Sequence, residues 1–450
     1  MKRKIYSELL EWKINSAGKT ALLIDGARRV GKSYIVEKFA KTEYKSYILI
    51  DFNKIGSDVK DLIDNRLNDL DILFMYLSEY FSVKLTARES VIIFDEVQLY
   101  PRARAAIKYL VADGRYDYIE TGSIVSIKKN VKDIVIPSEE RRIRMNPMDF
   151  EEFLWAIGND TLMPIIKTHF KEMKPLGQAM HRKTMDLFRQ YLIVGGMPQA
   201  VAEYISTHDF ERVDQVKRDI IALYREDITK HANGYKMKVV GIFDEIPAQL
   251  SKHEKKFKLS SLKKEARFRE YEDALFWLDD ARIINTCYNS TEPVIGLKLN
   301  MDRLTLKCYM NDTGLLISHA FDEKGIVSEE IYKKLLFDKL EVNKGMIIEN
   351  ITAQMLVASG HKLYFYSNLS RTDSSSRMEI DFLIAKNKVS SRHNISPIEV
   401  KSSNNYTLSS IRKFKEKYKS QLHTPFVLHT SDLKVEDGIV FLPIYMTPCL

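Results

Sequence analysis

Residues 26–33 have the residue types and spacing of a phosphate-binding loop. They read Gly-Ala-Arg-Arg-Val-Gly-Lys-Ser, which fits the pattern GxxxxGK[ST]. The loop follows an apolar run, ALLID, and precedes a helical pattern, SYIVEKFAK, so backbone N–H groups and a helix N-terminus would face a phosphate. A chance glycine–lysine turn is the competing interpretation, which this context disfavours. The candidate nucleotide-binding residues are Gly26, Ala27, Arg28, Arg29, Val30, Gly31, Lys32 and Ser33.

Hydrolysis of a bound nucleotide needs further groups, and the run SVIIFDE (90–96) offers two acids. We expect Lys32 to reach the β- and γ-phosphates and Ser33 to ligate Mg²⁺. Asp95 would hold the same metal, and Glu96 would polarise the attacking water as the catalytic residue. A strand capped by two solvated acids is the alternative.

The next apolar run, YDYIETGS (116–123), also ends in polar residues. Thr121 or Ser123 could form a hydrogen bond with the γ-phosphate. The local sequence alone is a weak signal for this role. The support comes from the position of this run in the chain, because it follows the run that carries Asp95 and Glu96. Further on, the segment 139–144 carries arginines that could neutralise transition-state charge.

These motifs lie on alternating elements that predict the fold class of the first 150 residues. Four short apolar runs are separated by helix-like stretches and end in an acid, glycine or small polar residue; they cover 20–26, 45–52, 90–96 and 116–123. Such alternation is typical of a parallel sheet covered on both faces. Ligands of these sheets bind at the carboxyl ends of the strands, where the motifs stand.

Composition restricts the class of protein. The chain has 450 residues, of which 45% are hydrophobic, so several cores can form. Three cysteines without a CxxC pattern favour a reducing compartment and argue against structural zinc. We find no apolar run of membrane-spanning length and no signal peptide, and therefore expect a cytoplasmic protein without membrane contact.

The net charge of +8 is mild, but the basic residues cluster in one segment. Residues 252–269 contain eight Lys or Arg against two Glu. A helix precedes this segment, and a second helix and two β-like runs (282–289 and 294–300) follow it, in the order of a winged helix-turn-helix. A solvated face and a winged helix that holds partners are the alternatives. The candidate DNA-binding residues are Lys263, Lys264, Arg267 and Arg269.

The C-terminal part contains a second pattern of acids and lysine. Asp381 lies in the run EIDFLIAK, and Glu399 and Lys401 share one face of the next predicted strand, SPIEVKSS. This is the pattern of PD-(D/E)XK nucleases, in which Asp381 and Glu399 would hold Mg²⁺ and Lys401 would assist catalysis. Glu349, on the preceding helix, is a further candidate acid. A salt-bridged relic without activity would show the same residues.

Several segments together resemble one family. GARRVGKS, VIIFDEVQ, ETGS, RRIRMNPMDFEEFL, YLIVGGMPQAV, YMNDTGLL and IEVKSS are similar to prokaryotic AAA-superfamily (P-loop) ATPases with a C-terminal domain of unknown function. The resemblance covers nearly the whole chain. It implies an AAA ATPase domain, a helical lid, a winged-helix region and a C-terminal domain of restriction-endonuclease-like fold. Arg29 departs from the glutamine that this family often has.

We therefore predict an α/β protein: a parallel-sheet AAA-type ATPase domain (1–150), a helical lid (151–239), a winged helix-turn-helix (240–310) and a PD-(D/E)XK nuclease-like domain (311–450). The predicted cofactors are ATP and Mg²⁺. DNA and a second copy of the chain are candidate partners. The leading hypothesis is an ATPase whose nucleotide switch is coupled to a DNA-directed, nuclease-like module. The alternative is a non-nucleolytic regulatory ATP-binding protein that docks DNA or a protein.

Overall fold

The computed structural model describes residues 1–122, 138–232, 234–252, 254–321, 328–337, 339, 344–368, 377–385, 394–403 and 405–450. The chain forms two compact units: residues 1–146 with 280–282, and residues 147–279 with 283–450. The predicted four-part division is finer than these two units and stays a prediction. No helix in the described ranges is both long and apolar enough to cross a bilayer.

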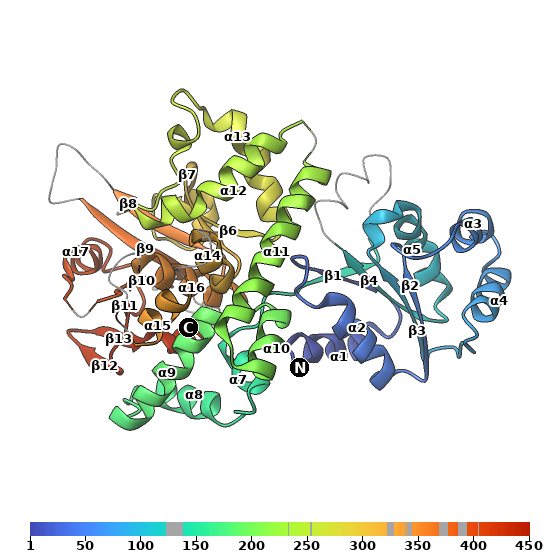
Figure 1. Cartoon of the computed structure of the whole chain (residues 1–450), viewed down its shortest axis with the longest axis horizontal. Coiled ribbons are helices and arrows are strands. Elements are labelled where there is room, and N and C mark those ends of the chain that lie inside the picture. Colours follow the sequence, from blue (N-terminus) through green and yellow to red (C-terminus); the bar gives the residue numbers. More distant parts are fainter. Residues whose placement is uncertain are drawn as a thin grey trace. The chain divides into compact units, whose positions relative to one another are not determined.

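The first unit is built on a five-stranded sheet of order β2-β3-β4-β1-β5, as the parallel-sheet prediction requires (Figure 1). All four predicted apolar runs form parallel strands, and β5 adds a fifth. The strands are β1 (Ala21–Asp25), β2 (Ser46–Asp51), β3 (Ser90–Asp95), β4 (Asp117–Gly122) and β5 (Glu140–Arg144). Because β4 lies between β1 and β3, the carboxyl ends of these three strands are neighbours.

Helices cover both faces of this sheet, because alternate strand residues point to opposite sides. On one face, α1 (Ile5–Ser16) and α2 (Lys32–Glu43) pack on residues such as Leu22 and Ile93. On the other face, α3 (Ser57–Arg66), α4 (Leu70–Tyr80) and α5 (Pro101–Asp113) pack on Leu23 and Ile92. Burial on both faces explains why these strands read as continuous apolar runs.

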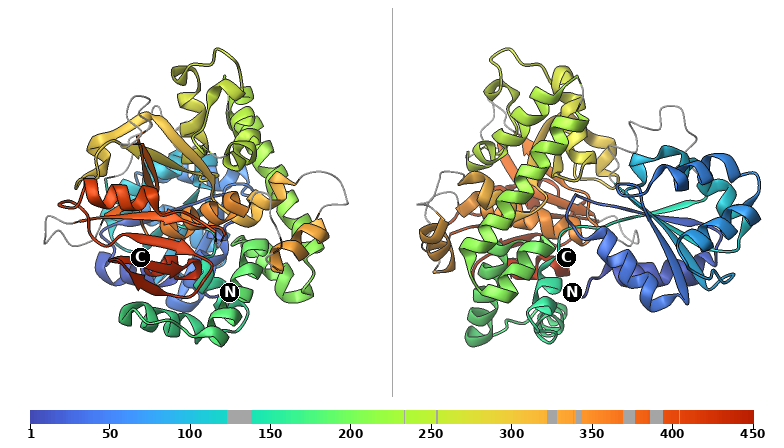
Figure 2. Two further views of the ribbon diagram at one scale, coloured as in Figure 1. Left: turned by 90° about the vertical axis from the view of Figure 1, so that its left-hand side faces the viewer. Right: turned by 45° about the vertical axis from the view of Figure 1, so that its right-hand side comes forward.

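The second unit combines a helical region with an eight-stranded mixed sheet of order β12-β13-β11-β10-β9-β8-β6-β7 (Figure 2). Its strands are β6 (Ile284–Ser290), β7 (Met301–Met310), β8 (Tyr364–Asn368), β9 (Met378–Ala385), β10 (Ile395–Val400), β11 (Phe426–His429), β12 (Lys434–Glu436) and β13 (Ile439–Pro443). Thus β6 and β7, which come from the predicted winged-helix segment, share one sheet with the C-terminal strands.

The helices of this unit begin with α7 (Phe150–Ala156), α8 (Leu162–Glu172), α9 (Gln178–Val194), α10 (Pro198–Thr207), α11 (Phe210–His231), α12 (Lys236–Ser251) and α13 (Phe268–Asp280). They continue with α14 (Thr313–Ala320), α15 (Ser328–Leu336), α16 (Lys344–Ala358) and α17 (Ser409–Lys417). One face of α13 is buried, with Tyr271, Ala274, Leu275 and Leu278. On the sheet, Ile411 and Phe414 of α17 pack against a face of β9 that includes Ile380.

The prediction for the second β-like run, residues 294–300, is wrong. Residues 294–300 were expected to be extended, but Leu297–Asn300 form a 3-10 turn and the strand β7 begins at Met301. Gly296, with φ 82°, turns the backbone into the left-handed region directly before it. Pro293 before this turn lacks an N–H for strand pairing, so the apolar residues of this run do not form a ladder.

A buried carboxylate joins two distant segments of the helical region. Asp312 accepts a hydrogen bond from Leu315 N at 2.9 Å, which caps α14, and another from Gly196 N at 2.6 Å. Gly196 also accepts one from Met148 N at 2.7 Å. A Cβ at Gly196 would lie 2.1 Å from the Met148 carbonyl oxygen, so this position requires glycine.

We predict that Gly196→Ala destabilises the second unit by at least about 1–3 kcal/mol, because a backbone atom cannot move aside as a flexible side chain would. The matched control is Gly241→Ala within α12, where a Cβ would meet only Leu262 Cδ2 at 3.6 Å. That change should be neutral or stabilising by up to about 1 kcal/mol. Urea unfolding of both variants measures the difference, and equal effects would contradict the prediction.

Candidate nucleotide site and carboxylate–lysine cluster

The phosphate-binding loop lies between β1 and α2, and its backbone conformation depends on two glycines. Gly31 has φ 97° directly before α2. A Cβ at Gly26 would lie 2.5 Å from the Met145 carbonyl oxygen, so that position has no room for a side chain. Arg29 also adopts a left-handed conformation, with φ 68°. Arg28 and Arg29 are exposed, whereas Ala27 and Val30 are buried in the unit.

The Lys32 ammonium is buried inside the loop. Its Nζ donates hydrogen bonds to the carbonyl oxygens of Gly26 at 2.9 Å and of Ala27 at 3.1 Å. Burial lowers the pKa of Lys32, and the nearby carboxylates of Glu96 and Asp95 oppose that effect. The side chain therefore lies against the backbone of its own loop, and its contact with phosphates stays a prediction.

Residues from a helix and two neighbouring strands meet at one carboxylate oxygen. Asp95 Oδ1, at the end of β3, accepts hydrogen bonds from Ser33 Oγ at 2.8 Å and from the Thr121 hydroxyl. Thr121 Oγ1 in turn accepts one from Glu96 N at 3.3 Å. The strand order explains this contact, because β4 carries Thr121 between the loop and Asp95. Ser123 lies outside the described residues.

Two contacts near the loop were not predicted from the sequence. Glu96 has φ 55°, and its carboxylate accepts a hydrogen bond from Gln98 Nε2. Asp25 Oδ2, directly before the loop, accepts hydrogen bonds from Arg282 Nη2 at 3.0 Å and Nε at 3.2 Å. Gln98 could have been noticed by its position two residues after Glu96. Arg282, far away in the sequence, gives no such signal.

These residues fit a nucleotide with Mg²⁺. Ser33 and Asp95 place two oxygen ligands side by side, and the Lys32 ammonium lies in the adjacent loop. Proteins commonly bind Mg²⁺ through one or two such oxygens together with substrate phosphates and water. In the parts of the chain that the structure describes, no group of three or more His, Cys, Asp or Glu is arranged to hold a metal without such help.

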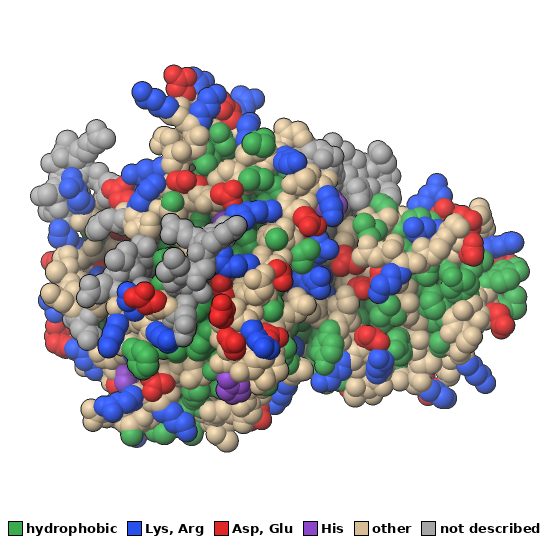
Figure 3. All heavy atoms as spheres, viewed as in Figure 1, with side chains coloured by type: hydrophobic (Ala, Val, Ile, Leu, Met, Phe, Trp, Pro, Cys, Tyr) green, Lys and Arg blue, Asp and Glu red, His purple; other side chains and the backbone are tan. Residues whose placement is uncertain are grey.

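The basic segment 252–269 divides into two sets of residues. Lys255 and Lys256 turn inward: Lys255 contacts Glu349, and Lys256 Nζ donates to Ser367 Oγ at 2.6 Å. Lys252 and Lys258 form surface ion pairs with glutamates at 3.6 Å and 3.1 Å. Figure 3 shows basic side chains gathered around the tip of this segment, above α12 and α13. The exposed basic residues Lys263, Lys264, Arg267 and Arg269 are the predicted DNA-binding set.

The C-terminal candidates do not meet at one point. Asp381 Oδ2 accepts a hydrogen bond from Val400 N at 2.8 Å. Glu399 is instead paired with Lys401, whose Nζ lies 2.5 Å from Oε1. Burial raises the pKa of Glu399 to about 6, although Lys401 opposes the effect. Alternation along β10 explains why Glu399 and Lys401 are adjacent.

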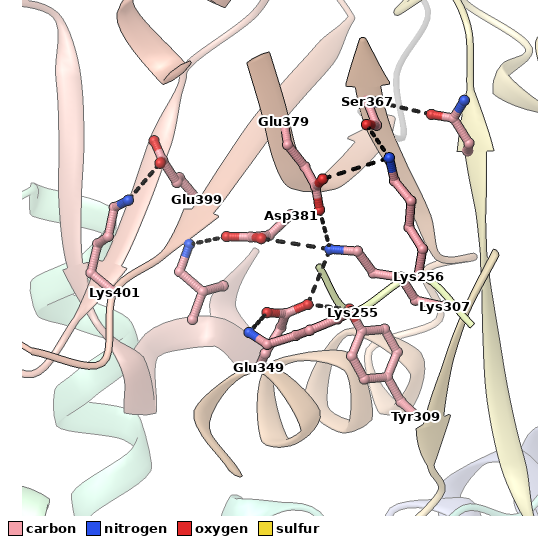
Figure 4. Close-up of polar contacts among 12 residues, drawn as sticks. Lys255, Lys256, Lys307, Tyr309, Glu349, Ser367, Glu379, Asp381, Glu399 and Lys401 are labelled. Atoms are coloured by element: carbon pink, nitrogen blue, oxygen red, sulfur yellow. Dashed lines mark hydrogen bonds and ion pairs between the residues drawn. The ribbon is translucent and has the colours of Figure 1, made fainter. Parts of the chain in front are cut away.

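Glu349 belongs to a buried cluster with lysines that the sequence did not associate with it (Figure 4). Its carboxylate contacts Lys255, lies 3.2 Å from Lys307 Nζ and accepts a hydrogen bond from the Tyr309 hydroxyl at 2.5 Å. Burial alone would raise the pKa of Glu349, but the positive charges of Lys255 and Lys307 lower it to about 2. The acid is therefore held ionised by ion pairing.

Parts of the chain match known families. Residues 18–154 match the model of an AAA domain, residues 185–324 that of a domain of unknown function (DUF8612), and residues 344–447 that of a second one (DUF4143). No curated protein matches the chain. The first unit thus has the parallel-sheet fold of a P-loop ATPase, and its match to an AAA domain agrees with the sequence resemblance.

The chain is also similar to several solved structures. The Walker-type ATPase of Pyrococcus abyssi has 16% identity and a TM-score of 0.44, over 71% of this chain and 95% of that chain. Orc1 of Aeropyrum pernix in complex with DNA has 10% identity and a TM-score of 0.28, over 72% and 93%. A STAND protein of Pyrococcus horikoshii has 12% identity and a TM-score of 0.27, over 80% and 49%. Such distant similarities carry no conclusion about what this chain binds.

The lowered pKa of Glu349 predicts a pH-dependent contribution to stability. A shift from 4.5 to about 2 corresponds to about 3 kcal/mol. Because the folded-state pKa is depressed, this contribution is complete above about pH 4.5 and is lost as the pH falls towards 2. Glu349→Gln should therefore be less stable than the wild type at pH 7, and the difference should shrink below pH 4.5.

Chemical unfolding at pH 7 and at several lower pH values measures this difference. The matched control is Glu436→Gln, an exposed glutamate whose ion pair with Lys434 is on the surface. Surface pairs contribute little, so that variant should follow the wild type at every pH. A gap for Glu349→Gln that is independent of pH would contradict the prediction.

Proposed function

We propose that the first unit binds and hydrolyses ATP with Mg²⁺, and that its nucleotide state is a switch for the second unit. The observation that carries this proposal is the contact of Ser33 and Thr121 with Asp95 Oδ1, beside a buried Lys32. The AAA-domain match over residues 18–154 supports the same class of activity. The proposal of coupling rests on the family resemblance.

The residues have separate roles in this proposal. Lys32 balances negative charge on the nucleotide phosphates, and the loop backbone orients them. Ser33 and Asp95 would hold Mg²⁺, which when bound neutralises phosphate charge. Glu96 orients the attacking water and accepts its proton, while the Gln98 side chain positions the Glu96 carboxylate. Thr121 fixes Asp95 and also accepts a hydrogen bond from Glu96 N, so it holds both acids.

Lys32→Ala should abolish tight binding of Mg·ATP, because it removes the buried positive charge of the loop. Glu96→Gln should retain ATP binding and lose at least about 100-fold in turnover, since general-base assistance contributes about that much. Calorimetry with ATP and a phosphate-release assay measure the two effects. Lys41→Ala on α2 and Glu89→Gln are matched controls at exposed positions and should behave as the wild type. Absence of ATP binding by the wild type would refute the proposal.

A second candidate function is nucleic-acid binding by the second unit. Four basic side chains are exposed just before α13 or in its first turn: Lys263, Lys264, Arg267 and Arg269. On the other side of this helix, Tyr271 and Leu275 are buried. Basic side chains at the start of such a helix are suited to phosphate contacts. The inward-turned Lys255 and Lys256 do not belong to this surface, so it is smaller than the segment's composition suggests.

Replacing Lys263, Lys264 and Arg267 by alanine should weaken DNA binding and flatten its dependence on salt. Each phosphate contact contributes about 0.9 to the slope of log K against log salt, so the slope should fall by about two to three units. The control removes the same charge from other exposed residues on α8 and α9, namely Lys171, Arg182 and Lys183. Fluorescence anisotropy between 50 and 200 mM salt, about the range over which such contacts are lost, measures both variants. Equal slopes for the two variants would identify the segment as a solvated face.

For the C-terminal part we propose only a fold, that of the PD-(D/E)XK nucleases, and no activity. The PD-(D/E)XK-like arrangement of residues 311–450 is supported by the positions of Glu349 on α16, Asp381 on β9 and Glu399 with Lys401 at the end of β10. The expectations of a homo-oligomer and of a cytoplasmic location stay predictions.

A further inference from the structure

The carboxylate–lysine cluster contains three acids from two elements: the buried Glu349 on α16, and the partly exposed Glu379 and Asp381 on β9. Glu379 and Asp381 are two positions apart on one strand, so their side chains share a face. Both glutamates and the aspartate point towards the same centre in Figure 4. A nuclease-like metal site would have to use this group, because it contains the predicted ligand Asp381.

The ammonium of Lys307 occupies the centre of this group. Its Nζ lies 2.9 Å from Glu379 Oε1, 3.2 Å from Glu349 Oε1 and 3.7 Å from Asp381 Oδ1. Lys307 comes from β7, and its side chain is 1% exposed. Three carboxylates therefore surround the ammonium at ion-pairing distance.

The second oxygen of each acid also has a partner. Glu349 Oε2 contacts Lys255, Glu379 Oε2 lies 3.9 Å from Lys256 Nζ, and Asp381 Oδ2 accepts a hydrogen bond from Val400 N. The charges balance, because the three carboxylates face the ammonium groups of Lys307, Lys255 and Lys256. No carboxylate oxygen of the cluster is left without a donor or cation.

A divalent cation does not fit this arrangement. It would lie against the Lys307 ammonium. Of the remaining predicted ligand, Glu399, Oε1 is paired with Lys401, and only the buried Oε2 has no hydrogen-bond partner among the described residues. Mg²⁺ requires oxygen ligands that are free to coordinate it, usually with several waters. A buried charge is stable only when it is paired, and the three acids around Lys307 are paired without a metal.

We propose that the ammonium of Lys307 is the resident cation of this cluster, in the place that a divalent metal would take, and that the C-terminal sheet carries out no metal-dependent phosphodiester cleavage. The cluster instead fastens β7 and residues 255–256 to α16 and β9 by charge. This inference goes beyond the nucleotide switch and does not depend on it.

The first test compares the full-length wild type with Asp381→Asn. Mn²⁺ is titrated without nucleotide and its binding is followed by electron paramagnetic resonance; any weak binding near Asp95 is common to both proteins. We expect the same number of bound Mn²⁺ ions in both, and no cutting of plasmid DNA with Mg²⁺ or Mn²⁺, with or without ATP. One additional Mn²⁺ site in the wild type, or cleavage that Asp381→Asn abolishes, would overturn the proposal.

The second test removes the cation itself. In Lys307→Met three carboxylates face only Lys255 and Lys256, so the thermal unfolding midpoint should fall and added Mn²⁺ should restore part of it. Lys307→Arg keeps the charge and should show no response to Mn²⁺. Lys298→Met, at an exposed lysine, is the matched control. A folded Lys307→Met whose midpoint is unaffected by Mn²⁺ would show that Lys307 does not exclude the metal; if that variant does not fold, the first test decides.

Discussion

The pairing of the buried Lys307 ammonium with Glu349, Glu379 and Asp381 is the interaction on which the second unit depends. Lys307 lies on β7, the edge strand of an eight-stranded sheet, while the acids lie on α16 and β9. Removing one partner of such a group leaves an uncompensated charge in the interior, which typically costs about 3–5 kcal/mol. The ion pairs therefore add to the backbone pairing of β6 with β8, which joins the strands of the predicted winged helix to the C-terminal strands.

The same pairing divides the basic segment into a structural part and an exposed part. Lys255 and Lys256 are required as counter-charges for the acids, so they cannot serve an external phosphate at the same time. Lys263, Lys264 and Arg267 remain exposed. A charge run that looks uniform in the sequence is thus divided, because part of it neutralises buried acids and the rest faces solvent.

In the first unit the decisive constraint is the strand order. With β4 between β1 and β3, a threonine at the end of β4 lies between the phosphate-binding loop and the acid of β3. Asp95 then receives hydrogen bonds from both sides, from Ser33 and Thr121. Because each partner is on a different element, the geometry of the site is fixed by the sheet itself, and a small displacement of any one strand would alter it.

The sequence by itself determined the P-loop ATPase domain, because the loop motif, the continuous apolar strands and the acids at their ends are local patterns with a definite spacing. It also determined that Glu399 and Lys401 are neighbours, since alternation along a strand is local. Only the tertiary structure decided which polar groups meet. The partners in these contacts are far apart in the chain, and no local period relates them. Examples are Lys307 with Glu349, Asp25 with Arg282, and Gly196 with Asp312. The position of β7 was missed for a related reason: residues 294–300 are apolar enough for a strand, but backbone conformation at Gly296 and pairing with β6 decide where the ladder begins.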